Sequence, residues 1–72
     1  GELLYKMTNI VNLWHKKEAI LNDLGYTFHV DPDQFYVRHN ETGDVIHIAK
    51  SDTSTLTAIT NAIEMAQEIN NG

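Results

Sequence analysis

The spacing of apolar residues changes twice along this chain of 72 residues, and the change limits the folds that it can adopt. From about Thr8 to Leu24, apolar residues recur every three or four positions, as they do on one side of an amphipathic helix. After Gly25 they alternate with polar residues, which is typical of a strand with one buried face. From Ser51 onward the helical spacing returns. The pattern predicts a helix, three strands and a second helix.

Two short turns separate the predicted strands, which cover residues 26–31, 35–40 and 45–50. The first turn contains Pro32, whose fixed φ suits the second position of a type I turn. The second contains Gly43, which can adopt a positive φ. Strands joined by such short connections pair in antiparallel fashion. We therefore predict an α+β fold (αβββα) with a three-stranded antiparallel meander, both helices on one face of the sheet, and a single domain over residues 1–72.

The ends of the helices carry recognisable signals. Thr8 is expected to cap the first helix, and Gly25 to end it in a left-handed conformation. Residues 51–54 are all good N-cap residues for the second helix. Residues 1–7 leave two alternatives open: they are disordered or added ahead of a natural start at Met7, or they are native and lengthen the first helix by one or two turns.

The pairing of the second and third strands decides which side chains face outward, because a shift by one residue exchanges the two faces of a strand. Pairing His39 with Val45 would expose both Ile46 and Ile48 to water. Full burial of an isoleucine stabilises the fold by about 1.5–3 kcal/mol. We therefore expect His39 opposite Ile46, which buries both isoleucines and points His47 away from the apolar face.

The apolar face of the sheet and one stripe of each helix should form the core. Trp14 falls on the apolar stripe of the first helix, whereas Lys16 and Lys17 fall on its solvated side. The predicted core residues are Ile10, Trp14, Leu21, Phe28, Val37, Ile46, Ile48, Leu56, Ile59 and Ile63.

The opposite face of the sheet holds the candidate binding residues. The expected cross-strand rows are Thr27–Arg38–His47 and His29–Tyr36–Ala49, which place Arg38 at the centre. Tyr and Arg are enriched among the residues that dominate binding energy, and a Tyr ring can stack on a base. The candidate binding residues are Tyr36, Arg38, His29, His47 and Thr27. The other residues expected on this face are Asp31, Asn40, Val45 and Ala49.

The residue pattern argues against catalysis and against bound metal. His29 and His47 are expected two strand spacings apart, roughly 9–10 Å at the backbone, with the cation of Arg38 nearby. The chain has no Cys, which removes thiolate chemistry and disulfides. Ser51 and Ser54 serve as helix caps, and no Gly-x-Ser-x-Gly motif is present. We predict a protein that is not an enzyme, with no catalytic residue, no metal site and no small-molecule cofactor.

Ten acidic against five basic residues give the chain a formal charge of −5. Charge of this sign repels nucleic-acid phosphates and anionic lipid at long range. No apolar run is long enough to span a membrane and no secretion signal is visible, so we expect a cytoplasmic protein with no membrane partner. A protein partner or a second copy of the chain is favoured over nucleic acid.

The αβββα order resembles that of double-stranded-RNA-binding domains, which grip duplex phosphates with a basic helix start. Here the second helix opens with Ser-Asp-Thr-Ser-Thr at residues 51–55 and carries Glu64 and Glu68 but no Lys or Arg. The RNA-binding function is therefore not carried over. The element order is also similar to that of some small acidic phage proteins that inhibit host nucleases by occupying their nucleic-acid sites.

The favoured hypothesis is a small non-enzymatic interaction domain that binds a protein partner or itself through the open sheet face. One alternative is a nucleic-acid-binding module that uses the same Tyr/Arg/His patch. Another is a small acidic phage-type inhibitor of a nucleic-acid-binding protein.

Overall fold

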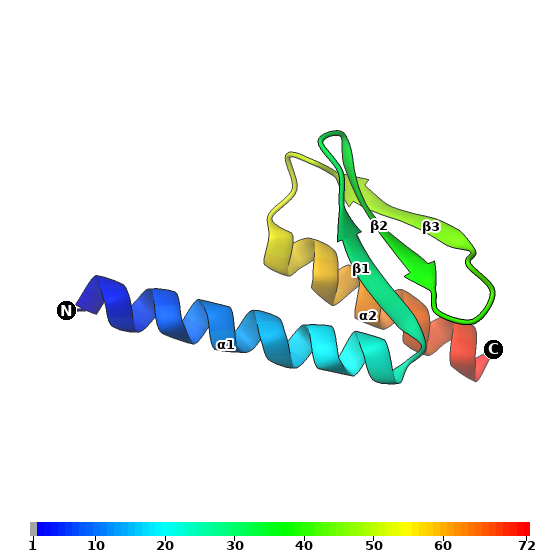
Figure 1. Ribbon diagram of the computed structural model, residues 1–72, viewed down its shortest axis with the longest axis horizontal. Helices are drawn as coiled ribbons and strands as arrows, with labels where there is room; N and C mark the ends of the chain where they lie inside the picture. Colours follow the sequence, from blue (N-terminus) through cyan, green and yellow to red (C-terminus); the bar gives the residue numbers. More distant parts are fainter. Residues whose placement is uncertain (1) are drawn as a thin grey trace.

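The computed structural model describes residues 2–72, and side chains from residue 10 onward. Its elements, in order, are α1 (Glu2–Asp23), β1 (Tyr26–Val30), β2 (Gln34–His39), β3 (Val45–Lys50) and α2 (Thr55–Asn71). The strands form one antiparallel sheet in the order β1-β2-β3, and both helices lie against the same face of it (Figure 1). The predicted αβββα fold is confirmed. In this described part of the chain, neither helix offers the long apolar stretch that crossing a bilayer requires.

The core lies between the sheet and the two helices. Trp14 of α1 meets Phe28 of β1 edge to face, with ring centroids 5.4 Å apart and an interplanar angle of 78°. Phe28 in turn stacks on Phe35 of β2, with centroids 5.7 Å apart. Both arrangements are favourable for aromatic pairs. The buried side chains are Leu21, Tyr26, Phe28, Phe35, Val37, Ala58, Ile59, Ala62 and Ala66.

Three alanines give α2 a flat inner side. Ala58, Ala62 and Ala66 follow one another at four-residue spacing, which places them on one face of the helix, and none of them is exposed. Their short side chains let α2 approach its neighbours closely. The helix contacts α1 and all three strands, so it is the element that joins the two sides of the core.

The predicted core is partly confirmed. Ile10 is 53% exposed, because the N-terminal half of α1 extends beyond the sheet and α2 (Figure 1). Contact with the core begins one turn later, at Trp14. Leu21, Phe28, Val37 and Ile59 are buried as expected. The remaining predicted core residues are partly buried: Trp14, Ile46, Ile48, Leu56 and Ile63.

The start of α1 differs from the prediction. The helix begins at Glu2, so Thr8 lies inside it and is not its N-cap. Residues 2–7 are helical, and residue 1 lies outside the described part of the chain. At the other end, Gly25 has the expected positive φ of +99°, a conformation in which a Cβ atom would be strained.

The second helix starts where the sequence predicts. Ser54, one of the four candidate caps, occupies the N-cap position of α2. Its carbonyl accepts the first helical hydrogen bond from the Ala58 N–H at 2.9 Å, while its hydroxyl makes no capping hydrogen bond. The cap therefore acts through backbone conformation.

The register between β2 and β3 is two residues away from the predicted one. Val37, and not His39, lies opposite Ile46. The cause is the tight connection, in which the His39 N–H donates to the Asp44 carbonyl at 2.8 Å and the Gly43 N–H donates to the His39 carbonyl at 2.9 Å. Because the shift is even, Ile46 keeps its place on the apolar face, as predicted.

A β-bulge in β3 changes the second half of that strand. Tyr36 pairs with His47, but Phe35 pairs with Ala49, so Ile48 is an extra residue without a partner on β2. Both Ile48 and Ala49 pack against the core. The prediction that Ala49 faces outward is therefore wrong, since a bulge re-aims the side chains that follow it.

Candidate binding face

The side of the sheet away from the helices forms the candidate site, here called the open face. Residues opposite one another in an antiparallel pair project from the same side of the sheet, so the observed register assigns its members. In residues 2–72 no helix or strand covers this side (Figure 1). The open face consists of Thr27, His29, Gln34, Tyr36, Arg38, Val45, His47 and Lys50.

Tyr36 is the centre of the open face. It lies opposite His29 on one side and opposite His47 on the other, which makes the row His29–Tyr36–His47. The rings of His29 and Tyr36 stack with centroids 5.0 Å apart and an interplanar angle of 11°. The predicted row placed Ala49 beside Tyr36, and the even shift of register replaces it with His47.

His47 is held by a neighbour on β2. Its Nδ1–H donates to Oε1 of Gln34, with 2.6 Å between the two atoms. A neutral imidazole has one donor and one acceptor nitrogen, so this bond leaves Nε2 of His47 as the acceptor. Gln34 orients the ring and presents a defined atom to a partner.

Arg38 lies in the neighbouring row, between Thr27 and Val45. Arg38 is exposed, and Val45 is 54% exposed. The Thr27 hydroxyl donates to Oδ1 of Asn40 at 2.5 Å and is thereby already engaged within the domain. The structure brings together all five predicted binding residues, with Arg38 beside the centre and not at it.

Lys50 joins the open face through the bulge. The extra residue, Ile48, turns Ala49 inward and places Lys50 opposite Gln34. Lys50 was not predicted as a site residue, because strict alternation from Ile46 and Ile48 points it to the other face. No residue in β3 marks a bulge in the sequence; the length of the preceding turn is the feature that could have revealed the shift.

The open face is basic in an acidic chain. Arg38 and Lys50 are two of the five Lys and Arg residues, and the three strands contain no Asp or Glu. The nearest carboxylates in the sequence, Asp31, Asp33 and Asp44, belong to the connections at the strand ends. The three strands therefore carry two positive charges and no negative charge.

His39 is accounted for by local structure. Its ring packs edge to face on Tyr26, with centroids 4.9 Å apart. Its Nδ1 accepts hydrogen bonds from the N–H groups of Glu41 and Thr42, both at 3.2 Å. His39 therefore helps to order the β2–β3 connection.

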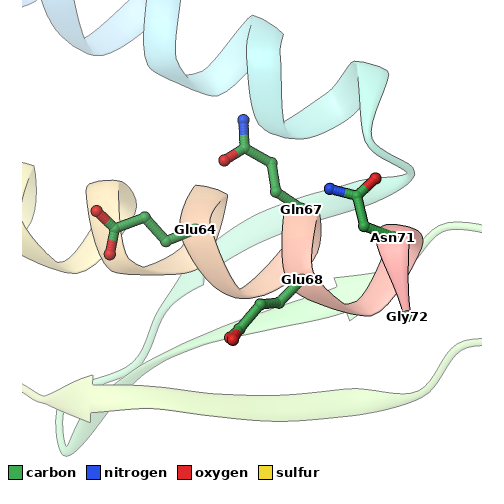
Figure 2. Close-up of a pocket in the computed structure, with 5 residues that line it drawn as sticks. All are labelled: Glu64, Gln67, Glu68, Asn71 and Gly72. Carbon is green, nitrogen blue, oxygen red and sulfur yellow. The ribbon is translucent and has the colours of Figure 1, made fainter.

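A depression of about 600 Å³ lies on the outer side of α2, near its C-terminal end (Figure 2). Its lining residues, Glu64, Gln67, Glu68, Asn71 and Gly72, come from one stretch of chain and are all exposed. Among the described residues no three His, Cys, Asp or Glu side chains come together in an arrangement that could hold a metal ion. We do not assign a site to this depression, because it is open to solvent and one helix end builds all of it.

Comparison with known proteins gives no family for the chain. No protein-family model matches it, and no curated protein or solved structure is similar enough to count as a match.

Proposed function

We propose that this domain is a non-enzymatic interaction module that binds an acidic surface of a protein partner through the open face, in the cytoplasm. The observation that supports the proposal is the central row His29–Tyr36–His47 with Arg38 on one side and Lys50 on the other. The proposal includes no enzymatic activity. That the protein is not an enzyme stays a prediction from the sequence.

The chemistry of the face suits a protein surface with exposed carboxylates. Arg38 can donate two parallel hydrogen bonds to one carboxylate, and Lys50 adds a mobile positive charge. Tyr36 and Val45 supply apolar contact area, and Val45 would lose its 54% exposure on binding. Tyr and Arg together are the residue types that most often dominate binding energy.

The size of the open face predicts a modest affinity. Three strands of five or six residues make a surface of roughly 20 Å by 10–15 Å. This is smaller than the roughly 800 Å² per partner of a standard interface. The complex should therefore be transient unless the partner also contacts the strand connections.

Single-stranded nucleic acid is the second candidate ligand. The observation in its favour is the same stacked pair, His29 and Tyr36, beside two cations, since base stacking and phosphate contacts together bind single strands. The formal charge of −5 opposes it at long range. A phage-type inhibitor would present carboxylates to a basic site, and the open face carries cations instead.

Photo-cross-linking in native cells tests the proposal. A benzophenone amino acid at Val45 lies on the open face, whereas the same group at Glu64 lies on the outer side of α2 and serves as the control. We expect one protein adduct from position 45 and none from position 64. Adducts from position 64 alone, or equal adducts from both, would contradict the proposal.

A further inference from the structure

β3 forms the edge of the sheet that lies away from α1. The strand order β1-β2-β3 gives β3 a hydrogen-bonded neighbour on one side only. Among the described residues, α1 contacts β1 and α2 but not β3, and Figure 1 shows β3 on the side of the sheet away from α1. The backbone groups along the free side of β3 can therefore pair with a further strand, which is how many domains bind extended peptides.

The hydrogen bonds at the β2–β3 connection show which backbone groups of β3 are free. The His39 N–H donates to the Asp44 carbonyl at 2.8 Å. Bonded positions recur at every second residue of an antiparallel strand, so Ile46 directs its N–H and C=O toward β2. Val45 and His47 direct theirs toward the free side. These two residues together offer two donors and two acceptors to an added strand.

The bulge limits the length of an added strand. Ile48 has no partner on β2, and the regular alternation of backbone groups is interrupted there. Pairing on the free side is therefore restricted to the first part of β3, around Val45 and His47. A bulge and a lysine at an edge also discourage the open-ended pairing of identical strands. Both features favour a short ligand strand over a second copy of β3.

The charges along this edge favour acidic residues on one side of the added strand. A residue opposite His47 would project from the open face. Lys50 is the next residue of β3 on that face, because the bulge takes up the extra residue, and it lies diagonal to this position at roughly 7–8 Å. β3 itself contains no Asp or Glu. A carboxylate opposite His47 would therefore meet a cation and no like charge from the strand.

The other side of the added strand would meet apolar residues. A residue opposite Ile46 would project from the same side of the sheet as α2. Ile46 and Ile48 are only partly buried, so an apolar side chain in this position would cover more of their surface. A carboxylate there would approach α2, which carries Glu64 and Glu68 and no basic residue.

We propose that the acidic partner binds as an extended segment of alternating acidic and apolar residues, which adds antiparallel to β3. Its carboxylates lie on the open face, and an apolar residue lies against Ile46. The inference rests on the proposed function, because it gives the form in which an acidic partner meets the open face. The contact is far smaller than a standard interface, so we expect a dissociation constant of ~0.1–1 mM for such a segment alone.

NMR titration of the full chain with synthetic peptides tests the strand addition. The probe is a peptide of alternating Glu and Val that begins and ends with Glu. In the proposed pairing the N–H groups of Glu face β3, whereas those of Val face solvent. N-methylation of every Glu should therefore weaken binding at least ~10-fold relative to N-methylation of every Val. Equal binding of the two methylated peptides, or no binding of the unmodified peptide at ~2 mM, would overturn the proposal.

Val45→Pro tests the same edge from the side of the protein. Val45 is the first residue of β3 and its N–H points to the free side, a position where a sheet tolerates proline. Val45→Thr keeps the N–H and the branched shape and serves as the control. With unchanged far-UV circular dichroism, Val45→Pro should bind the unmodified peptide at least ~5-fold more weakly, and Val45→Thr as wild type does. Wild-type affinity in a folded Val45→Pro protein would contradict the strand addition.

These results are distinguishable from a failure of the proposed function. If the cross-linked partner requires Tyr36 and Arg38 but the peptides show no dependence on N-methylation, the open face binds the partner without an added strand. If the partner binds a folded Tyr36→Ala, Arg38→Ala protein as it binds wild type, the proposed function itself is wrong, whatever the peptides do.

Discussion

In the proposed interface, Tyr36 would be the contact anchor, because its neighbours already fix its position. His29 stacks against its ring, and His47 lies on the other side in an orientation set by Gln34. A side chain that is held before binding loses less conformational freedom when a partner arrives. The Tyr36 ring is therefore held in place before binding, unlike the ring of a surface tyrosine that rotates freely.

Ile59 and Ile69 should contribute differently to stability, because they differ in burial. Ile59 is fully buried, so Ile59→Ala should lower the free energy of unfolding by ~2–5 kcal/mol. Ile69 is 48% exposed, and Ile69→Ala should cost less than about 1 kcal/mol. Urea unfolding of the two variants measures the difference. Equal losses would show that the core is placed wrongly.

Gly43 is required for its backbone conformation and not for space. Its φ is +79°, and a Cβ atom added there would meet nothing within 4 Å. Gly43→Ala should therefore cost ~1–2 kcal/mol from left-handed strain alone. A D-alanine at the same position, introduced by chemical synthesis, relieves the strain and should be neutral or slightly stabilising. Thermal unfolding measures the two effects. If steric crowding were the cause, L-alanine and D-alanine would destabilise the protein equally.

Among the elements, the sequence was sufficient for the fold and for the faces of β1 and β2, but not for the faces of Ala49 and Lys50 in β3. The alternation of Phe35 and Val37 with Tyr36 and Arg38 shows which side is buried, because burial of apolar residues repeats with the period of the strand. The sequence did not predict the register between β2 and β3 or the bulge in β3. Both depend on where the His39–Asp44 hydrogen bond closes the β2–β3 connection. Connections closed at other residues would keep the same alternation of buried and exposed side chains.

The bulge in β3 predicts a defined set of contacts in solution. Cross-strand nuclear Overhauser effects should connect Tyr36 with His47 and Gln34 with Lys50, because these residues lie opposite one another. A regular ladder in the register predicted from the sequence would instead connect Tyr36 with Ala49. Observation of that second pattern would remove Lys50 from the open face and contradict the account of the site.

The sequence placed the five candidate residues on one face of the sheet, but it missed Gln34 and Lys50 and put Arg38 at the centre. The sequence identifies the aromatic and cationic residues on one face, because parity alone assigns them. The position of Tyr36 between two histidines, and the arrival of Lys50, follow from long-range pairing that no local pattern encodes. The exposure of Ile10 was missed for a similar reason. Helical periodicity identifies the apolar stripe of α1, but it does not show how much of that stripe the sheet and α2 cover.

In the whole molecule, the open face belongs to the sheet, whereas the exposed apolar residues of α1 lie on the half of that helix that extends beyond the sheet (Figure 1). The open face is basic and partly aromatic, whereas the exposed stripe of α1 is apolar and belongs to a neutral helix.

The salt dependence of binding distinguishes a nucleic-acid ligand from a protein partner, because contacts with phosphates weaken steeply as salt rises. Fluorescence anisotropy with a labelled ten-nucleotide single strand, at 50 and 200 mM salt, measures any nucleic-acid affinity directly. We expect no binding tighter than the ~10⁻⁴ M of weak non-specific contacts. Micromolar binding that falls steeply with salt and is lost in Lys50→Ala would instead favour the nucleic-acid candidate over a protein partner.

The most direct test of the open face is the affinity of the cross-linked partner, measured by titration calorimetry against matched variants. The double variant Tyr36→Ala, Arg38→Ala should stay folded, because neither side chain belongs to the core, and should bind at least ~100-fold more weakly, as loss of two dominant contacts predicts. The double variant Lys16→Ala, Lys17→Ala on α1 should bind as wild type does. A folded Tyr36→Ala, Arg38→Ala protein with wild-type affinity, or a loss confined to the Lys16→Ala, Lys17→Ala variant, would show that the open face is not the binding surface.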